Sequence, residues 1–202
     1  RDALPALAKN DAGPLAVILT AAEGDTKKQK DRAGAVSSLR TAAIGKSVGE
    51  FKLTDLTNRE WSPADFKDKV VILHFWEYRD TPLEEPYGQV AYLDFFQRKW
   101  KDKVLVLGIN VDPRLEDAAT RRTAATTAKK LRDFMNLTYP ILLDDGKFLK
   151  QVGDPRTAEA KLPLFVVLGK NGQVVEYHSG FYAVQRERGL ADLEEVVKKA
   201  SE

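Results

Sequence analysis

The chain contains no cysteine among its 202 residues. This absence excludes disulfide bonds, thiolate metal ligands and cysteine nucleophiles from the sequence. It does not assign a redox compartment, because a cysteine-free chain is compatible with reducing and oxidising surroundings alike. Histidine is almost as scarce, with only His74 and His178. Neither has carboxylates nearby at the spacing of a metal site, so we expect no bound metal and no cofactor.

An excess of one charge is also missing. The chain has 32 basic and 30 acidic residues, a formal net charge of +2. Acidic residues interrupt its basic runs, as in Lys101-Asp102-Lys103, which indicates solvated surfaces and no nucleic-acid binding. No apolar run approaches the ~20 residues of a membrane span. Because the chain begins at Arg1 and not at Met, we expect a mature or trimmed product.

Residues 1–47 differ in composition from the rest of the chain. They are rich in Ala, Lys and Thr and hold one apolar cluster, LAVIL at 15–19. The pattern predicts two short helices, at about 14–23 and 27–44, separated at Glu23-Gly24-Asp25. Such a segment is too small and too rich in alanine to form a core alone. We therefore interpret residues 1–47 as a helical N-terminal extension of a domain that spans 48–202.

From residue 48 onward, apolar runs alternate with amphipathic stretches. Residues 70–76 (VVILHFW) and 104–111 (VLVLGINV) read as strands covered on both faces. Residues 164–168 and 173–177 flank Asn171-Gly172, a strong hairpin signal. One helix is expected to start near 62–65, and another is expected between the strands at 70–76 and 104–111. Further helices are expected at about 115–136, at 146–152 and at the C-terminus. The pattern predicts an α/β domain with a central mixed sheet flanked by helices.

Three stretches of this domain, in order, resemble the thioredoxin-like superfamily. The similarity is to the branch of TlpA- and ResA-like thiol–disulfide oxidoreductases and AhpC/TSA-type redoxins. It is carried by residues 62–76 (SPADFKDKVVILHFW), 139–153 (YPILLDDGKFLKQVG) and 161–180 (KLPLFVVLGKNGQVVEYHSG). The resemblance covers about residues 48–200. It implies a thioredoxin-like fold, a cis peptide at Leu162-Pro163 and an extracytoplasmic location.

In that family two cysteines open the helix after the Phe-Trp strand. On this sequence their positions hold Asp80 and Leu83, and neither residue can exchange a disulfide. The resemblance therefore implies the family scaffold without its chemistry, and we expect no thiol–disulfide oxidoreductase activity. One interpretation of residues 81–84 (TPLE) is purely structural. Thr, Pro and Glu at this spacing form a capping box that satisfies the N–H groups of a helix start.

The alternative interpretation is a recognition face. In the family, the residues around the helix start and before the cis-proline grip an extended polypeptide, which requires no thiol. We therefore predict a face that binds a protein or a peptide. Its candidate residues are Trp76, Tyr78, Asp80, Thr81, Pro82, Tyr87, Leu162 and Pro163. The opposing interpretation makes Trp76 and Tyr87 packing residues, and the sequence leaves both interpretations open.

Two functional hypotheses follow. The leading one is a redox-inactive thioredoxin-like module for protein binding or scaffolding. The second is an enzyme of the same fold that uses non-thiol chemistry around Asp80 and Tyr78. His74, in the middle of a strand, is expected to be a buried structural histidine. Asp144-Asp145-Gly146 predicts a turn and helix cap, since the remaining ligands of a calcium loop are absent.

Overall fold

The computed structural model describes residues 14–78, 89–100 and 103–202, with side chains from residue 17 onward. The chain divides into two compact units, residues 1–38 and residues 39–202. We call the second unit the sheet domain. Among the helices described, none combines the length and the apolar character that crossing a membrane requires.

Most of the described part of the first unit is helical, and the predicted break in it was wrong. A single helix, α2, runs from Pro14 to Ala43. The Thr26 hydroxyl donates to the Ala22 carbonyl at 2.7 Å, directly across the expected interruption. A glycine inside a helix costs only about 1 kcal/mol relative to alanine, and the Ala- and Lys-rich surroundings of Gly24 offset that. The boundary between the two units falls inside α2.

The described residues of the sheet domain form a sheet of seven strands in the order β2-β1-β5-β4-β3-β6-β7. Strands β3, β4 and β5 are parallel to one another, and every other pair is antiparallel. The strands are β1 Leu53–Asp55, β2 Glu60–Trp61, β3 Val70–Trp76, β4 Val104–Asn110, β5 Ile141–Leu143, β6 Leu164–Leu168 and β7 Val174–Ser179. The predicted mixed sheet and its final hairpin are confirmed.

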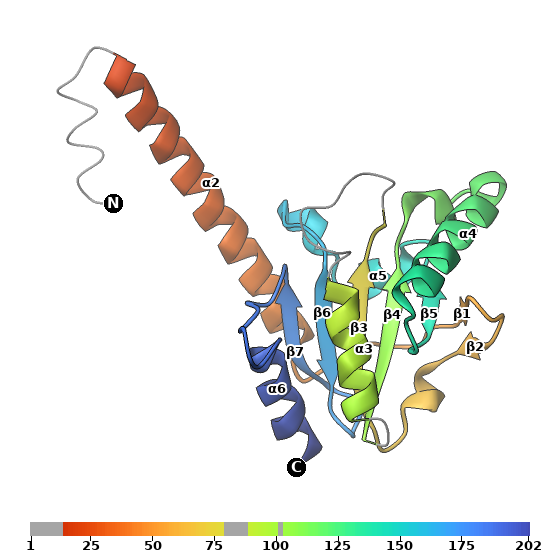
Figure 1. The fold of residues 1–202 in the computed structure, drawn as a ribbon. Coiled ribbons are helices and arrows are strands. Elements are labelled where there is room, and N and C mark those ends of the chain that lie inside the picture. The colour runs from red at the N-terminus through yellow and green to blue at the C-terminus, as the bar shows by residue number, and fades with distance from the viewer. Residues whose placement is uncertain (1–13, 79–88, 101–102) are drawn as a thin grey trace. The chain divides into compact units, whose positions relative to one another are not determined.

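Helices cover both faces of this sheet, and Figure 1 shows α3 in front of it and α5 behind it. The α-helices are α3 Val90–Lys99, α4 Ala118–Met135, α5 Lys147–Val152 and α6 Ala191–Ser201. Short 3-10 helices are η1 Pro63–Phe66, η3 Pro113–Leu115 and η4 Pro155–Ala158. The helix expected at 115–136 is therefore split into η3 and α4. Asp117 begins α4 by accepting a hydrogen bond from the Ala119 N–H.

Alternation along β3 divides the core into two layers. Val71, Leu73 and Phe75 pack toward α5, while Val70, Ile72 and Trp76 pack toward α3 and α6. All seven residues of β3 are buried, because helices cover both sides. This explains the near-continuous apolar run in the sequence. It also places the end of β3 in the middle of the sheet.

Asp55 is the polar anchor of the β1–β2 hairpin. It is only 6% exposed. Its Oδ1 accepts hydrogen bonds from the Thr57 N–H, the Thr57 hydroxyl and the Arg59 N–H at 2.6–3.0 Å, and Oδ2 accepts one from Trp61 Nε1 at 2.9 Å. Burial raises the pKa of Asp55, but these hydrogen bonds outweigh burial and the net shift is downward.

Replacing Asp55 by alanine is expected to lower the free energy of unfolding by about 2–4 kcal/mol, because several donors lose their buried acceptor. Urea unfolding measures this, with exposed Glu50→Ala as the control. A depressed carboxyl pKa stabilises the fold above the unfolded value and loses that effect as pH falls through the folded pKa. The stability gap between wild type and Asp55→Asn should thus be full at neutral pH and shrink as the pH falls below the unfolded value and through the lower folded pKa. A gap independent of pH would contradict the assignment.

Candidate functional site

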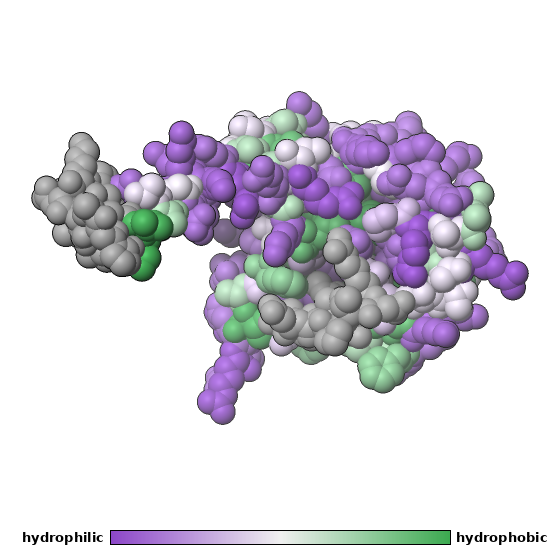
Figure 2. All heavy atoms as spheres, turned by 90° about the horizontal axis from the view of Figure 1, so that it is seen from above, coloured by the Kyte–Doolittle hydropathy of each residue, from purple (hydrophilic) through white to green (hydrophobic). Residues whose placement is uncertain are grey.

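The parallel strands end together at one edge of the sheet domain, which we call the carboxyl edge. Trp76 pairs with Asn110, and Asn110 pairs with Leu143. Strand β6 runs the opposite way, so its first residue, Leu164, pairs with Phe75 at the same edge. The carboxyl ends of strands are where α/β folds commonly place ligand sites. Figure 2 views this edge from above and shows a largely hydrophilic rim with apolar residues inside it.

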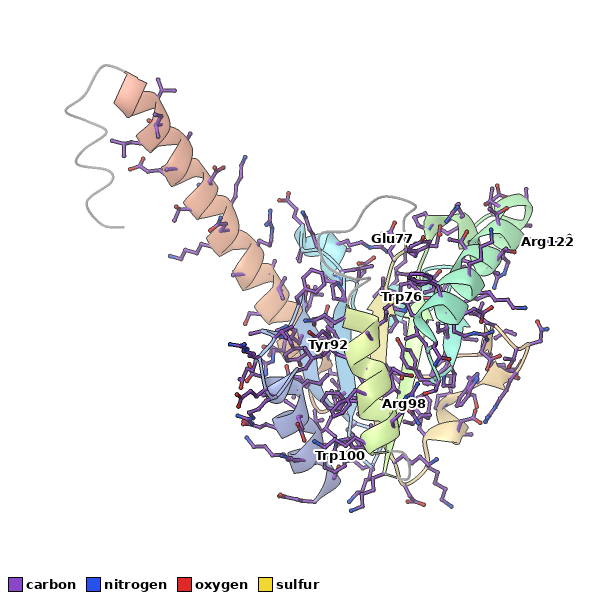
Figure 3. All side chains as sticks on the ribbon, viewed as in Figure 1. Trp76, Glu77, Tyr92, Arg98, Trp100 and Arg122 are labelled. Atoms are coloured by element: carbon purple, nitrogen blue, oxygen red, sulfur yellow. The ribbon has the colours of Figure 1, made fainter. Side chains whose placement is uncertain are left out.

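Trp76 does not belong to the surface of this edge. Its side chain is 1% exposed and lies in the core layer beneath α3. The indole is accommodated by Gly108 on the neighbouring strand, where a Cβ would lie 3.3 Å from Trp76 Nε1 and 2.8 Å from Tyr139 Cε2. This burial favours the packing interpretation of Trp76 over its inclusion in the recognition face. Figure 3 shows Trp76 and Glu77 at the end of β3.

Tyr78, Leu162 and Pro163 belong to the segments at the carboxyl edge, with Tyr78 and Leu162 packed against different layers of the core. Tyr78 is partly buried against the α3 side of the core, and the Leu162-Pro163 peptide bond is cis. The Gly180 N–H donates to the Pro163 carbonyl at 2.7 Å, and the Ser179 hydroxyl donates to the Lys161 carbonyl at 3.3 Å. Between these two anchored carbonyls, no hydrogen bond from any described residue engages the backbone N–H or C=O of Leu162.

The remaining predicted site residues lie outside the described residues. They are Asp80, Thr81, Pro82, Leu83 and Tyr87. The capping box at residues 81–84 and the non-thiol chemistry around Asp80 accordingly stay predictions. The described helix α3 begins at Val90, with Gln89 before it. The Gln89 side chain bridges to the Tyr182 backbone, donating to its carbonyl at 2.9 Å and accepting from its N–H at 3.0 Å.

Both histidines pack against aromatic rings. His74 is fully buried, with its ring centre 4.6 Å from that of Phe165. His178 stacks on Tyr182 at 3.9 Å with an interplanar angle of 17°. In the part of the chain that the structure describes, no group of three or more His, Asp or Glu side chains is placed to hold a metal ion.

Asp144 caps a helix, as the sequence predicted. It accepts hydrogen bonds from the Phe148 and Leu149 N–H groups at 3.1 and 2.9 Å, at the start of α5. Burial raises the pKa of this carboxyl, and the two N–H groups oppose that rise. The group has the role of a cap in a short buried turn.

The sequence analysis missed a pair of identical turns at the carboxyl edge. Asp112-Pro113-Arg114 follows β4, and Asp154-Pro155-Arg156 follows α5. In each, proline opens a 3-10 helix, and the aspartate accepts hydrogen bonds from the backbone N–H, Nε and Nη2 of its own arginine at 2.6–3.1 Å. Both carboxylates are buried, at 4% and 7% exposure. We call these the Asp-Pro-Arg turns.

The guanidinium of Arg156 interacts with the carboxylate of its own turn and with the charge of Glu116, next to the other turn. Its hydrogen bond to Asp154 raises the pKa of the guanidinium most, burial opposes this, and the charges of Glu77 and Glu116 raise it further. Glu77 follows β3, and Glu116 ends η3. One arginine thus interacts with carboxylates from three segments of the rim. The repeated tripeptide was the one signal in the sequence from which the turns could have been found.

Comparison with known proteins agrees with this geometry. The AhpC/TSA family profile matches residues 44–177. Thiol-disulfide oxidoreductase ResA of Bacillus cereus is 27% identical over 187 residues, with 92% of each chain covered. The ResA of Geobacillus thermodenitrificans is 30% identical over 142 residues, covering 68% of this chain and 70% of that protein.

Solved structures agree on the fold. A thiol:disulfide interchange protein DsbE from Chlorobium tepidum has a TM-score of 0.56 at 21% identity and covers 79% of this chain and 98% of its own. A DsbF homologue from Corynebacterium diphtheriae has a TM-score of 0.55 at 26% identity, covering 76% and 85%. The fold is thioredoxin-like, and the predicted fold class is confirmed. The chain belongs to the AhpC/TSA family and carries that family's scaffold without a single cysteine.

Proposed function

We propose that this protein is a redox-inactive thioredoxin-like module that binds an extended polypeptide at its carboxyl edge. Its relatives are named thiol-disulfide oxidoreductases. Disulfide exchange begins with attack by a thiolate, and this chain has no cysteine to supply one. The scaffold still has a surface on which a polypeptide can bind. Binding without disulfide exchange is therefore the function that fits its chemistry.

The observation that carries this proposal is the backbone at Leu162. Its N–H and C=O make no hydrogen bond to any described residue, although the carbonyls on both sides are anchored. A residue with both backbone groups open, next to the start of β6, suits pairing with an added strand. Tyr78, at the end of the adjacent β3, offers an aromatic surface, and such side chains contribute strongly to interfaces.

The rim supports the same proposal. Each of the two Asp-Pro-Arg turns at this edge is closed by hydrogen bonds from its arginine to its own buried carboxylate. A rim fixed in this way loses little conformational entropy when a ligand binds, which favours affinity. For location we propose the cell envelope, because one protein of similar fold is described as an exposed lipoprotein thioredoxin.

Site-specific photo-crosslinking in native extract tests the proposal. A photo-reactive residue at Lys161 lies beside Leu162, whereas one at Lys170 lies at the opposite end of β6, and both positions are exposed. We expect protein adducts at position 161, few at position 170, and loss of the adducts when Tyr78→Ala and Asp80→Lys are combined. Equal yields at both positions, or adducts that persist in the double variant with an unchanged melting temperature, would place the binding surface elsewhere.

A further inference from the structure

A second concave surface lies along α3, away from the carboxyl edge. It has a volume of about 530 Å³ and is lined by α3, by residues 184–190 and by Glu194 of α6. Small-molecule sites commonly measure about 300–1,000 Å³. Figure 3 shows Tyr92, one of the lining residues, on the side of α3 that faces α6. We call this surface the α3 groove.

The floor of the groove is apolar. Tyr92, Phe95 and Phe96 have the i, i+3, i+4 spacing that puts side chains on one face of a helix. Phe96 is 4% exposed, but Phe95 is 61% exposed and Val184, on the opposite wall, is 43% exposed. Large apolar side chains gathered in a hollow at this exposure are typical of a surface that something covers.

The wall opposite α3 is a fixed tight turn. Gln185 and Gly189 exchange two backbone hydrogen bonds of 2.8 Å, with Arg186, Glu187 and Arg188 at the tip. Gly189 has a φ of +60°, and a Cβ there would lie 3.6 Å from the Tyr92 ring. The turn therefore holds its charged tip beside the aromatic floor.

One cation of this lining is left over once the ion pairs are counted. The lining carries Lys99, Arg186 and Arg188 against two carboxylates, Glu187 and Glu194, and Arg188 is paired with Glu195 at 3.4 Å. Glu194 is neutralised twice, by Lys99 at 2.6 Å and by Lys198 at 3.6 Å. Among the described residues, Arg186 makes no ion pair, and its guanidinium is available to a ligand at the mouth of the groove.

From these features we propose that the α3 groove binds a small amphipathic anion with a linear apolar body and one carboxylate head, as in a medium-chain fatty acid. The apolar body covers Phe95 and Val184, which removes their surface from water. The head pairs with Arg186, whose planar guanidinium matches a carboxylate with two parallel hydrogen bonds. This site does not include the Leu162 backbone. The test of fatty-acid binding is therefore independent of the test of polypeptide binding.

Isothermal titration of the full chain tests this inference, with dodecanoate below its critical micelle concentration as the probe. Dodecyltrimethylammonium supplies a chain of the same length with the opposite charge. We expect one site for dodecanoate, with an affinity at least about tenfold higher than that for the cation. Equal affinities for the two head groups would overturn the proposal.

Two variants with matched controls locate the binding. Phe95→Ser and Arg186→Glu should each weaken dodecanoate binding about tenfold or more. Phe134→Ser and Arg122→Glu, changes of the same kind at exposed positions on α4, should leave it unchanged. Binding that survives Phe95→Ser would refute the site. So would a dimer in sedimentation velocity that Phe95→Ser dissociates, because a second copy would then be what covers the groove.

Discussion

Gly108→Val is expected to destabilise the sheet domain strongly. Gly108 lies in β4 at the centre of the sheet, with Trp76 and Tyr139 packed over it. Even a Cβ would lie 2.8 Å from the Tyr139 ring. Overpacking a dense core by single methylenes costs about 1–3 kcal/mol, so we expect Gly108→Ala to lose that much and Gly108→Val to lose more than about 3 kcal/mol. Circular dichroism and urea unfolding measure both.

Gly34→Ala is the matched control for this prediction. Gly34 lies inside α2, and nothing is within 4 Å of a Cβ built there. Exchange of glycine for alanine in such a position favours the helix by about 0.5–1 kcal/mol. If Gly108→Val folded with the wild-type urea midpoint, the packing of Trp76 and Tyr139 over position 108 would be wrong. Trp76 would then return as a candidate for the exposed binding face.

Restoring two cysteines is expected to restore disulfide chemistry. The double variant Asp80→Cys, Leu83→Cys places a Cys-x-x-Cys pair at the two positions that the sequence analysis predicts to match the family's cysteines. In thiol oxidoreductases a helix N-terminus lowers the thiol pKa and raises the thiolate fraction. We expect the wild-type chain to reduce insulin no faster than the uncatalysed background and the double variant to exceed that background clearly. The readout is insulin turbidity with dithiothreitol as the reductant.

A second Cys-x-x-Cys pair, placed elsewhere in the fold, tests whether activity depends on where the two cysteines lie or only on their presence. Ala118→Cys with Arg121→Cys puts the same spacing at the start of α4, a helix that follows β4 and not β3. This variant should stay near background, as should each single variant at Asp80 or Leu83, because a lone thiol cannot resolve a mixed disulfide. A folded Asp80, Leu83 double variant that remains at background would mean that the scaffold has lost more than its thiols.

Much of the fold could be predicted from the sequence, because local signals and tertiary packing agree there. The apolar runs of β3 and β4 and the Asn171-Gly172 turn each correspond to an observed element. The side on which Trp76 lies could not be predicted. In a strand buried on both faces, an apolar pattern does not distinguish an exposed edge position from a core position. The uninterrupted α2 shows a different limit, since one glycine is a weak breaker among strong helix formers.

The candidate sites were harder to predict than the fold. Asp112 and Asp154 differ from the aspartates on the chain's surface because they are buried. The spacing of residues along a sequence does not reveal burial. The α3 groove joins residues of α3 to a turn almost a hundred positions later in the chain. Only tertiary contact brings such segments together, so a single sequence gives no periodic signal for it.

The Asp-Pro-Arg turns have a consequence for the environments in which the rim keeps its geometry. Each turn closes a loop of only three residues, so little chain entropy opposes it, and its proline narrows the unfolded ensemble further. A disulfide bridge in the same place would form or be reduced according to the reduction potential of its surroundings. An arginine–carboxylate pair transfers no electrons. The rim should therefore have the same shape in glutathione buffer and in air, a property that amide exchange under the two conditions can measure.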